Sequence, residues 1–508
     1  MKKLSVIAIL GLLVLGMAAT ASAADIKATG NWKIEAYNLS GADFYKAGGQ
    51  SEGKSFNIEQ RVRTAFTFIA NENLRGILDT QIGPANWGNG LFTVGAGRGA
   101  GGTAIAAGPG NSGNSGAGNI MLRKGYIDFK WPGTAVNILA GFQTVSLPAA
   151  FGGGSAIFDD QAAAAMVVTP VTDNVKLLAG FSRLINSDVG TTASTTTWQN
   201  GSKATGDVVF AAVPVDFKGF NITPFAAYAN LGADVAADGT GATALRGFNG
   251  VNSSLNEGVR AYWGGFATTI TAFDGFKIMA DFNYGKATWN NQSSTNKADG
   301  GRAGWLADIA VDYTGLSMMT PSAFFVYSSG EEGNSTDNDK SGRMPVVANP
   351  QNWAVGSFFF GDREFATNPI ATGGTTSNVM GFWAAGVSLK DIKLIDKLSH
   401  TAHLIYIQGT NDKNFINENT ALSGVAANNA AYGRVLTEKD SLWEIDFNTK
   451  YMIYDELSVL LNLGYIANNI DKDTWANQST LAAATRNDIR NNGGQDAYRI
   501  ALGVNYNF

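Results

Sequence analysis

The last thirteen residues, DAYRIALGVNYNF (Asp496 to Phe508), alternate between two kinds of side chain. One parity is apolar or aromatic and consists of Tyr498, Ile500, Leu502, Val504, Tyr506 and Phe508. The other parity is small or polar and consists of Ala497, Arg499, Ala501, Gly503, Asn505 and Asn507. Side chains on a β-strand point alternately to two faces, so one face of this strand is apolar and ends in aromatic rings. The wall of a membrane β-barrel requires such a strand, apolar outside and polar inside.

The first residues form a separate, removable segment. Lys2 and Lys3 precede an apolar run from Leu4 to Met17, which is followed by small residues ending at Ala23. A basic start, a short apolar run and an A-x-A ending are typical of an export signal, and the run is too short to span a bilayer as a helix. We therefore predict a signal peptide over residues 1–23 and a single mature domain over residues 24–508.

Composition favours a barrel over other classes. The chain has 62 glycines, 11 prolines, 16% charged and 11% aromatic residues, and a mean hydropathy near zero. No apolar run after the signal is long enough for a transmembrane helix, whereas alternating strands give this average without apolar blocks. The absence of cysteine excludes disulfides and thiolate metal sites. The net charge of −5 gives no basic footprint for nucleic acid.

Alternation continues through the mature chain. Between residues 56 and 70, for example, Phe56, Ile58 and Val62 oppose Asn57, Glu59 and Arg61. This period of two with charge on one face indicates strands. We count eighteen strands, with sixteen as the alternative: 26–38, 56–70, 74–82, 120–131, 135–145, 162–171, 175–185, 207–215, 220–231, 258–273, 276–289, 303–314, 320–329, 379–389, 400–409, 441–453, 457–467 and 497–508.

The connections between these segments alternate in length. Short ones include 71–73, 132–134 and 172–174, whereas 84–119 and 330–378 are long. Short periplasmic turns and long extracellular loops characterise an antiparallel up-and-down outer-membrane barrel, and a soluble β-sandwich does not need this asymmetry. A barrel of 16–18 strands is wide enough to enclose an aqueous channel. An even strand count also brings both termini to one rim, where the last strand would pair with residues 26–38.

At this point the sequence resembles bacterial outer-membrane porins. Gly503, Tyr506 and Phe508 resemble the terminal pattern that the barrel-assembly machinery reads in that family. The stretches 60–63, 87–88, 147–148, 159–160, 396–401, 409–411, 436–441 and 454–457 are similar to the homotrimeric porins of sulfate-reducing and related bacteria. The resemblance implies a trimer of barrels in the Gram-negative outer membrane, surrounded by its lipid and lipopolysaccharide.

In trimeric porins the loop after the fifth strand folds into the lumen, and here this loop is 148–160. The resemblance then implies that Asp159 and Asp160 face basic residues near the barrel start, for which the candidates are Arg61, Arg63, Arg75 and Lys124. Opposite charges across a water-filled gap create a transverse field that orients polar solutes and sets ion selectivity. The alternative is that these charges are solvated wall or loop residues.

Two further pairs of residues limit the possible strand geometry and metal sites. Arg123 and Lys124 are adjacent, so both can face inward only if a β-bulge intervenes; otherwise Arg123 lies at the extracellular rim. His400 and His403 fall on opposite faces of a regular strand and cannot bind one metal ion without distortion. The sequence thus predicts no metal site, and it contains no motif for a cofactor.

The function that follows is passive diffusion of small hydrophilic solutes and ions through a water-filled, charge-lined channel, without enzymatic chemistry. A substrate-specific channel is the nearest alternative. Two rivals from other classes are an outer-membrane enzyme, which needs a Ser–His pair on the outer wall, and a sheath barrel around a partner protein.

Overall fold

The computed structural model describes residues 25–41, 44–46, 55–88, 120–186, 205–232, 255–291, 300–332, 342–347, 356, 381–414, 436–477 and 482–508. The predicted signal peptide lies outside these residues. The strands are β1 (Asp25–Ser40), β2 (Ser55–Asn71), β3 (Leu74–Asn86), β4 (Met121–Lys130), β5 (Asn137–Ser146), β6 (Asp159–Pro170), β7 (Lys176–Asn186), β8 (Thr205–Ala212), β9 (Val215–Phe217), β10 (Phe220–Leu231), β11 (Leu255–Ile270), β12 (Phe276–Asn291), β13 (Gly300–Tyr313), β14 (Thr320–Ser328), β15 (Phe382–Ile395), β16 (Leu398–Gly409), β17 (Ser441–Met452), β18 (Leu457–Asn469) and β19 (Ala497–Asn507).

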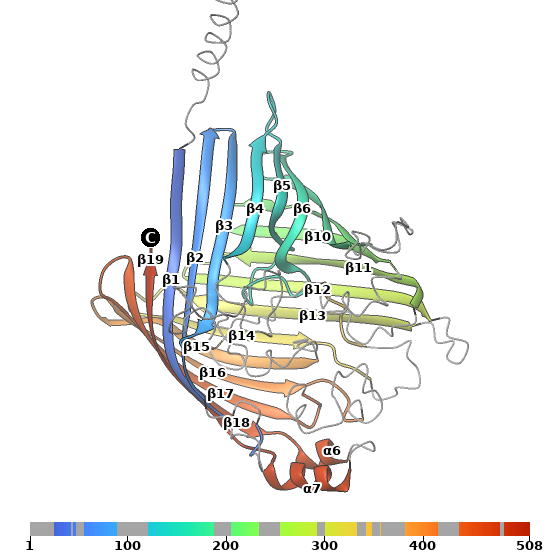
Figure 1. Ribbon diagram of the computed structural model, residues 1–508, viewed down its shortest axis with the longest axis vertical. Coiled ribbons are helices and arrows are strands. Elements are labelled where there is room, and N and C mark those ends of the chain that lie inside the picture. The colour runs from blue at the N-terminus through green and yellow to red at the C-terminus, as the bar shows by residue number, and fades with distance from the viewer. Residues whose placement is uncertain are drawn as a thin grey trace, which may run out of the picture.

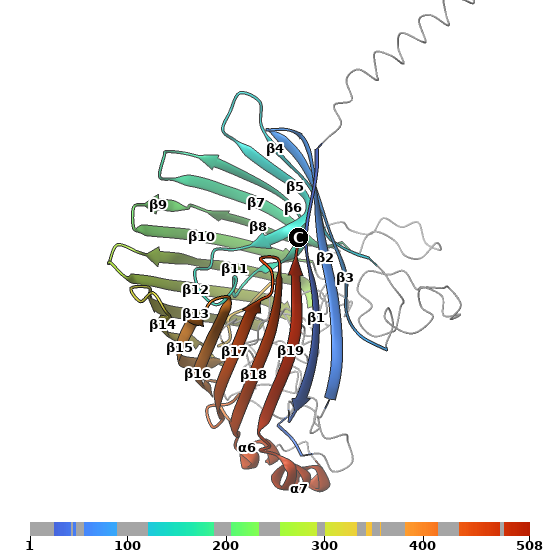
Figure 2. The same cartoon turned by 90° about the vertical axis from the view of Figure 1, so that its left-hand side faces the viewer.

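These strands form one closed antiparallel barrel (Figure 1). Apart from β8 and β9, each strand pairs with its neighbours in the chain, and β1 pairs with both β2 and β19. The closing register runs from Asn31 opposite Asn507 to Ser40 opposite Tyr498, and Figure 2 shows β19 lying beside β1. Because β8 and β9 share one place beside β10, the barrel has eighteen strand positions. The predicted fold class and strand count are confirmed.

Most predicted strand boundaries shift by a few residues, and two of the differences have a clear local cause. The strand expected over 207–215 is broken at Val213 and Pro214, since proline has no N–H to donate to a neighbouring strand. The connection expected over 390–399 is mostly strand: β15 continues to Ile395 through two irregularities in its pairing with β16. Only Asp396 and Lys397 form the turn, with Lys397 at a positive φ of 62°.

The two ends of the barrel are unlike. One end carries short turns, such as the two residues between β2 and β3. The other end carries α6 (Lys472–Ala476) and α7 (Ala483–Asn492), which lie opposite the chain's C-terminus (Figures 1 and 2). These helices lie in the connection between β18 and β19, and Asp471 caps α6 by accepting from the amides of Asp473 and Thr474. Among the described helices, none is both long and apolar enough to cross a membrane.

Alternation sorts side chains between the lumen and the outside of the barrel. On β19 the exposed fraction is 50% for Ile500 and 56% for Leu502, but 7% for Arg499 and 1% for Ala501. On this strand the large apolar side chains are therefore outside, and the inward side chains are polar or small. Strand closure pairs the backbone groups that hydrocarbon cannot hydrogen-bond. A closed barrel whose outer face is apolar belongs in the outer membrane.

Candidate functional site

Basic side chains line the inner face of β2. Arg61 and Arg63 alternate with outward residues and are buried or half-buried inside the barrel, together with Glu59. Arg63 donates from Nε to Oε1 of Gln81 on β3 at 2.6 Å. A guanidinium held by a neutral amide keeps its full charge towards the lumen, so this wall is electropositive.

The next inward arginine, Arg75 on β3, is paired. Its Nε and Nη2 donate to Oδ2 of Asp128 on β4 at 2.8 and 2.5 Å. The Asp128 side chain is 8% exposed and the Arg75 side chain 58%, so the carboxylate is shielded while the guanidinium reaches open space. Water screens this pair on the arginine side, which limits its contribution to stability.

A β-bulge turns Arg123 and Lys124 towards one carboxylate. The register between β3 and β4 shifts where Asp79 pairs with Lys124 and Thr80 pairs with Leu122. The Asp79 Oδ2 atom then lies 3.1 Å from Arg123 Nη1 and 3.6 Å from Lys124 Nζ. In a β-bulge, two residues of one strand lie opposite one residue of the neighbouring strand, so two adjacent side chains can pair with the same residue. This settles the choice between a bulge and a rim position in favour of the bulge.

The segment between β5 and β6 enters the barrel and reaches the far wall. The Ala150 amide donates to Asp281 Oδ1 on β12 at 2.8 Å, and the Phe151 amide donates to Asp281 Oδ2 at 2.9 Å. The Phe151 ring lies 5.6 Å from the Phe324 ring on β14, centroid to centroid. Residues 147–158 therefore cross the interior and narrow it. We call them the inner segment.

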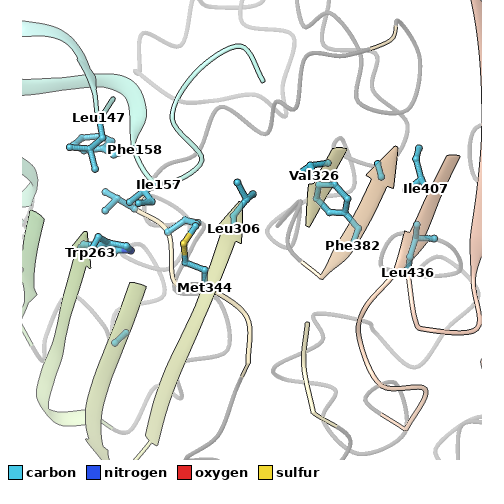
Figure 3. Close-up of a cluster of buried hydrophobic side chains, with 14 of the residues drawn as sticks. Leu147, Ile157, Phe158, Trp263, Leu306, Val326, Met344, Phe382, Ile407 and Leu436 are labelled. Carbon is cyan, nitrogen blue, oxygen red and sulfur yellow. The ribbon is translucent and has the colours of Figure 1, made fainter. Parts of the chain in front are cut away.

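A second stretch, residues 342–347, packs against the inner segment. The Val347 amide donates to the Ile157 carbonyl at 2.9 Å, and Trp263 Nε1 donates to the Pro345 carbonyl at 2.6 Å. Figure 3 shows Ile157, Trp263 and Met344 gathered in one buried apolar cluster. The hydrophobic effect and dispersion hold such a cluster together, so both stretches are fixed in the lumen.

The two predicted acidic residues take different faces of β6. Asp160 pairs with the buried Val145, on the inward parity, and is exposed. Asp159 pairs with Ser146, on the outward parity. The described contacts of Arg63, Arg75 and Lys124 do not include either carboxylate: Arg63 contacts Gln81, Arg75 contacts Asp128 and Lys124 contacts Asp79.

The lumen is not polar all round, contrary to the expectation of a charged or amide-rich inner face. The inward positions of β8, β10 and β11 are apolar, for example Val208, Phe210, Phe225, Ala227 and Trp263. They pack in the cluster that holds the two inner stretches. The signal was present in the sequence, because residues 208–212 are apolar on both parities, which indicates a strand buried on both faces.

At the loop end, Asp440 joins the connection before β17 to the one after β18. Its Oδ2 accepts from the Thr437 amide at 2.7 Å and from Trp475 Nε1 at 3.1 Å, and its Oδ1 accepts from the Asp471 amide at 2.8 Å. Burial raises the pKa of the Asp440 carboxyl, and these hydrogen bonds partly oppose the rise. This carboxyl therefore positions α6 beside the barrel mouth.

The outer wall has a belt of rings near its loop end. Trp305 stacks on Tyr327 at 4.7 Å between centroids, and Tyr406 lies 4.9 Å from Trp443. The belt extends across β10 to β19 as Tyr228, Tyr262, Tyr284, Trp305, Tyr327, Trp383, Tyr406, Trp443, Tyr465 and Tyr498. Amphipathic rings of this kind sit at the membrane–water interface.

The histidines lie on opposite faces and have different partners. His403 Nδ1 lies 2.7 Å from Ser388 Oγ on the inward face, and His400 Nδ1 lies 2.9 Å from Thr449 Oγ1. His400 also stacks on Phe447, which is outward. A shared metal site is therefore excluded for this pair. The Ser388–His403 contact faces the lumen rather than the outer wall, where a lipid-cleaving site would have to lie.

No protein-family model and no curated protein matches this chain. Among solved structures it is similar to Pseudomonas aeruginosa OpdQ, with 13% identity, a TM-score of 0.46, and coverage of 95% of this chain and 98% of that one. Acinetobacter baumannii OccAB3 has 10% identity, a TM-score of 0.45, and coverage of 95% and 99%. The outer membrane protein OprD of Pseudomonas aeruginosa has 13% identity, a TM-score of 0.45, and coverage of 96% and 95%. The closed strand pairing and apolar outer wall of this chain themselves identify it as an outer-membrane β-barrel protein.

Proposed function

We propose that the protein is a channel through which small hydrophilic solutes and ions diffuse passively across the outer membrane. The observation that carries this proposal is the electropositive wall of β2 to β4 inside a barrel narrowed by the inner segment. Apart from Lys130 at the rim, these strands hold five basic residues, Arg61, Arg63, Arg75, Arg123 and Lys124, against three acidic ones, Glu59, Asp79 and Asp128. A wall with excess positive charge raises the local concentration of anions.

The narrowing favours selective passage over a wide general pore. Two stretches fill part of the lumen and are held by an apolar cluster rather than by mobile contacts. A solute must therefore pass between a fixed inner segment and a charged wall, and such linings set ion selectivity. Among the alternatives above, a channel that prefers anionic solutes fits these contacts best.

A planar-bilayer recording of the purified protein tests the proposal. We expect ion-conducting steps in symmetric salt, and in a salt gradient a reversal potential of the sign that marks anion preference. A barrel that inserts without conducting, in the presence and absence of small organic anions, would contradict the channel function. A reversal potential of the opposite sign would contradict the anion preference that we assign to the basic wall, but not the channel function.

We further propose a homotrimer that buries the outer wall of β5 and β6. Four outward positions at one end of these strands are polar, namely Thr144, Ser146, Asp159 and Gln161, whereas the belt of rings covers β10 to β19. Polar side chains facing hydrocarbon are costly, so contact with another copy explains them better than lipid does. The resemblance to the homotrimeric porins of sulfate-reducing and related bacteria supports the same assembly.

Paired tryptophan substitutions separate this interface from the lipid-facing wall. Ala163 on β6 and Ala307 on β13 are both outward. Ala163→Trp is expected to shift the assembly from trimer to monomer in native mass spectrometry, and Ala307→Trp to leave it unchanged. Conductance of the wild-type protein in steps of three equal levels would agree with a trimer of channels. A monomeric wild-type protein would contradict the trimer but not the channel.

A further inference from the structure

Two carboxyl groups meet on the inner face of the barrel, away from the basic wall. Asp281 on β12 lies directly opposite Asp308 on β13, and the two carboxyl groups interact electrostatically. Both are buried, with 4% and 6% of their surface exposed. Asn283 is two residues beyond Asp281 on the same inward face and is 4% exposed.

No basic side chain compensates this pair among its described neighbours. On the adjoining strands the inward residues opposite Asp281 and Asp308 are Ala267 and Val326. The described polar contacts of Asp281, besides Asp308, are the backbone amides of Ala150 and Phe151. Two carboxylates in contact repel one another in a buried site unless a proton or a cation lies between them.

Two buried oxygen atoms of the same group have no hydrogen-bond partner within the described part of the chain. They are Asp308 Oδ1 and Asn283 Oδ1. Buried polar atoms are nearly always satisfied, so an orphaned pair in one place points to a missing partner. Carboxylate and amide oxygens are the ligands that hard cations prefer.

We propose that Asp281, Asp308 and Asn283 bind a calcium ion. A divalent cation balances the two carboxylates, and Asn283 supplies a neutral oxygen beside them. Calcium suits this group better than magnesium because it accepts irregular sets of oxygen ligands, whereas magnesium demands near-octahedral geometry. Water from the lumen would complete the coordination.

The proposed ion would also support the inner segment. Asp281 holds the amides of Ala150 and Phe151, so an ion that fixes the Asp281 carboxylate fixes the point where this segment meets the wall. Hydrogen bonds to a carboxylate that also binds a metal ion orient that ligand in many proteins. The site stands on these contacts alone and does not depend on the proposed channel function.

Calcium titration calorimetry on the folded protein in detergent, after removal of divalent ions by EGTA, tests the site. We expect saturable uptake of one calcium ion per chain, and a loss of affinity of at least tenfold in Asp308→Asn and Asn283→Leu. Asp312→Asn is the matched control, because Asp312 lies on the same strand but is paired with Lys390 at 2.9 Å. Absence of saturable uptake by the wild-type protein would overturn the site and leave a proton shared by the two carboxyls. Equal losses in Asp312→Asn would overturn it too.

Terbium luminescence gives a second measurement that needs no change in the ligands. Trp263 is buried on the inward face of β11, opposite Gly285, two residues beyond Asn283. Terbium bound at the site should therefore emit when tryptophan is excited, and calcium should displace it. Trp263→Phe should remove most of this emission while calcium uptake persists. Emission that is unchanged in Trp263→Phe would place the ion elsewhere and overturn the proposal, even if Asp308→Asn fails to fold.

Discussion

Gly30 and Phe508 exchange two backbone hydrogen bonds across the closure of the barrel. The Gly30 amide donates to the Phe508 carbonyl at 2.7 Å, and the Phe508 amide donates to the Gly30 carbonyl at 3.0 Å. The final residue is thus part of the β1–β19 ladder rather than a free end. Its ring also stacks on Tyr506, 5.6 Å between centroids. The last residue of the chain therefore seals the barrel.

Gly30 is expected to tolerate no side chain. A Cβ atom there would collide with the Arg63 carbonyl oxygen and with the Phe508 ring. Gly30→Val should cost about 1–3 kcal/mol through overpacking, and reduce the folded, heat-modifiable band in outer-membrane fractions. Gly76→Val is the control, since a Cβ at Gly76 meets nothing within 4 Å. Equal yields of the two variants would contradict the expectation.

Removal of Phe508 should impair assembly far more than conductance. The deletion takes away two closing hydrogen bonds and the terminal aromatic group that, with Gly503 and Tyr506, we predict to be the assembly signal. Barrel yield in vivo should fall sharply, whereas single-channel conductance of the protein that does insert should stay near the wild-type value. The two quantities are measured by outer-membrane immunoblot and by bilayer recording. Normal yield with altered conductance would refute the assembly role.

Asp159 and Asp160 should differ when each is neutralised. Asp160 has the inward parity and is exposed, so Asp160→Asn should shift the permeability ratio towards anions. Asp159 has the outward parity, so Asp159→Asn should leave the ratio unchanged and act, if at all, on subunit contact. Reversal potentials in a salt gradient measure both. A shift in Asp159→Asn alone would contradict this placement.

Arg63→Gln should weaken anion preference. One unit charge at about 8 Å in water contributes about 0.5 kcal/mol, which corresponds to roughly a twofold change in permeability ratio. Arg183→Gln is a matched control, because Arg183 points outward and pairs with Asp207 at 2.8 Å. High salt should shrink the difference between Arg63→Gln and the wild type through screening. An equal shift in both variants would show that the basic wall does not set selectivity.

The alternation of residues 496–508 was sufficient to predict the strand and its apolar outer face, and the even strand count added its partner, residues 26–38. Side-chain parity is a local property of a strand, and closure follows from the need to pair every edge in a membrane. The eighteen positions and the unlike ends of the barrel followed in the same way from period and connection length. The interruption at Pro214 and the irregular end of β15 were harder to predict, because both depend on how these residues pair with neighbouring strands.

The interior required the three-dimensional structure. Nothing local to Ala150 indicates that its amide meets Asp281, 131 residues away, and nothing local to Asp79 indicates that it serves both Arg123 and Lys124. A strand's own sequence decides which side chains face inward, but the register of distant strands and the path of the inner segment decide which of them meet. The strands of the barrel wall were thus predictable from the sequence, whereas the contacts between charges inside the barrel were set by long-range packing.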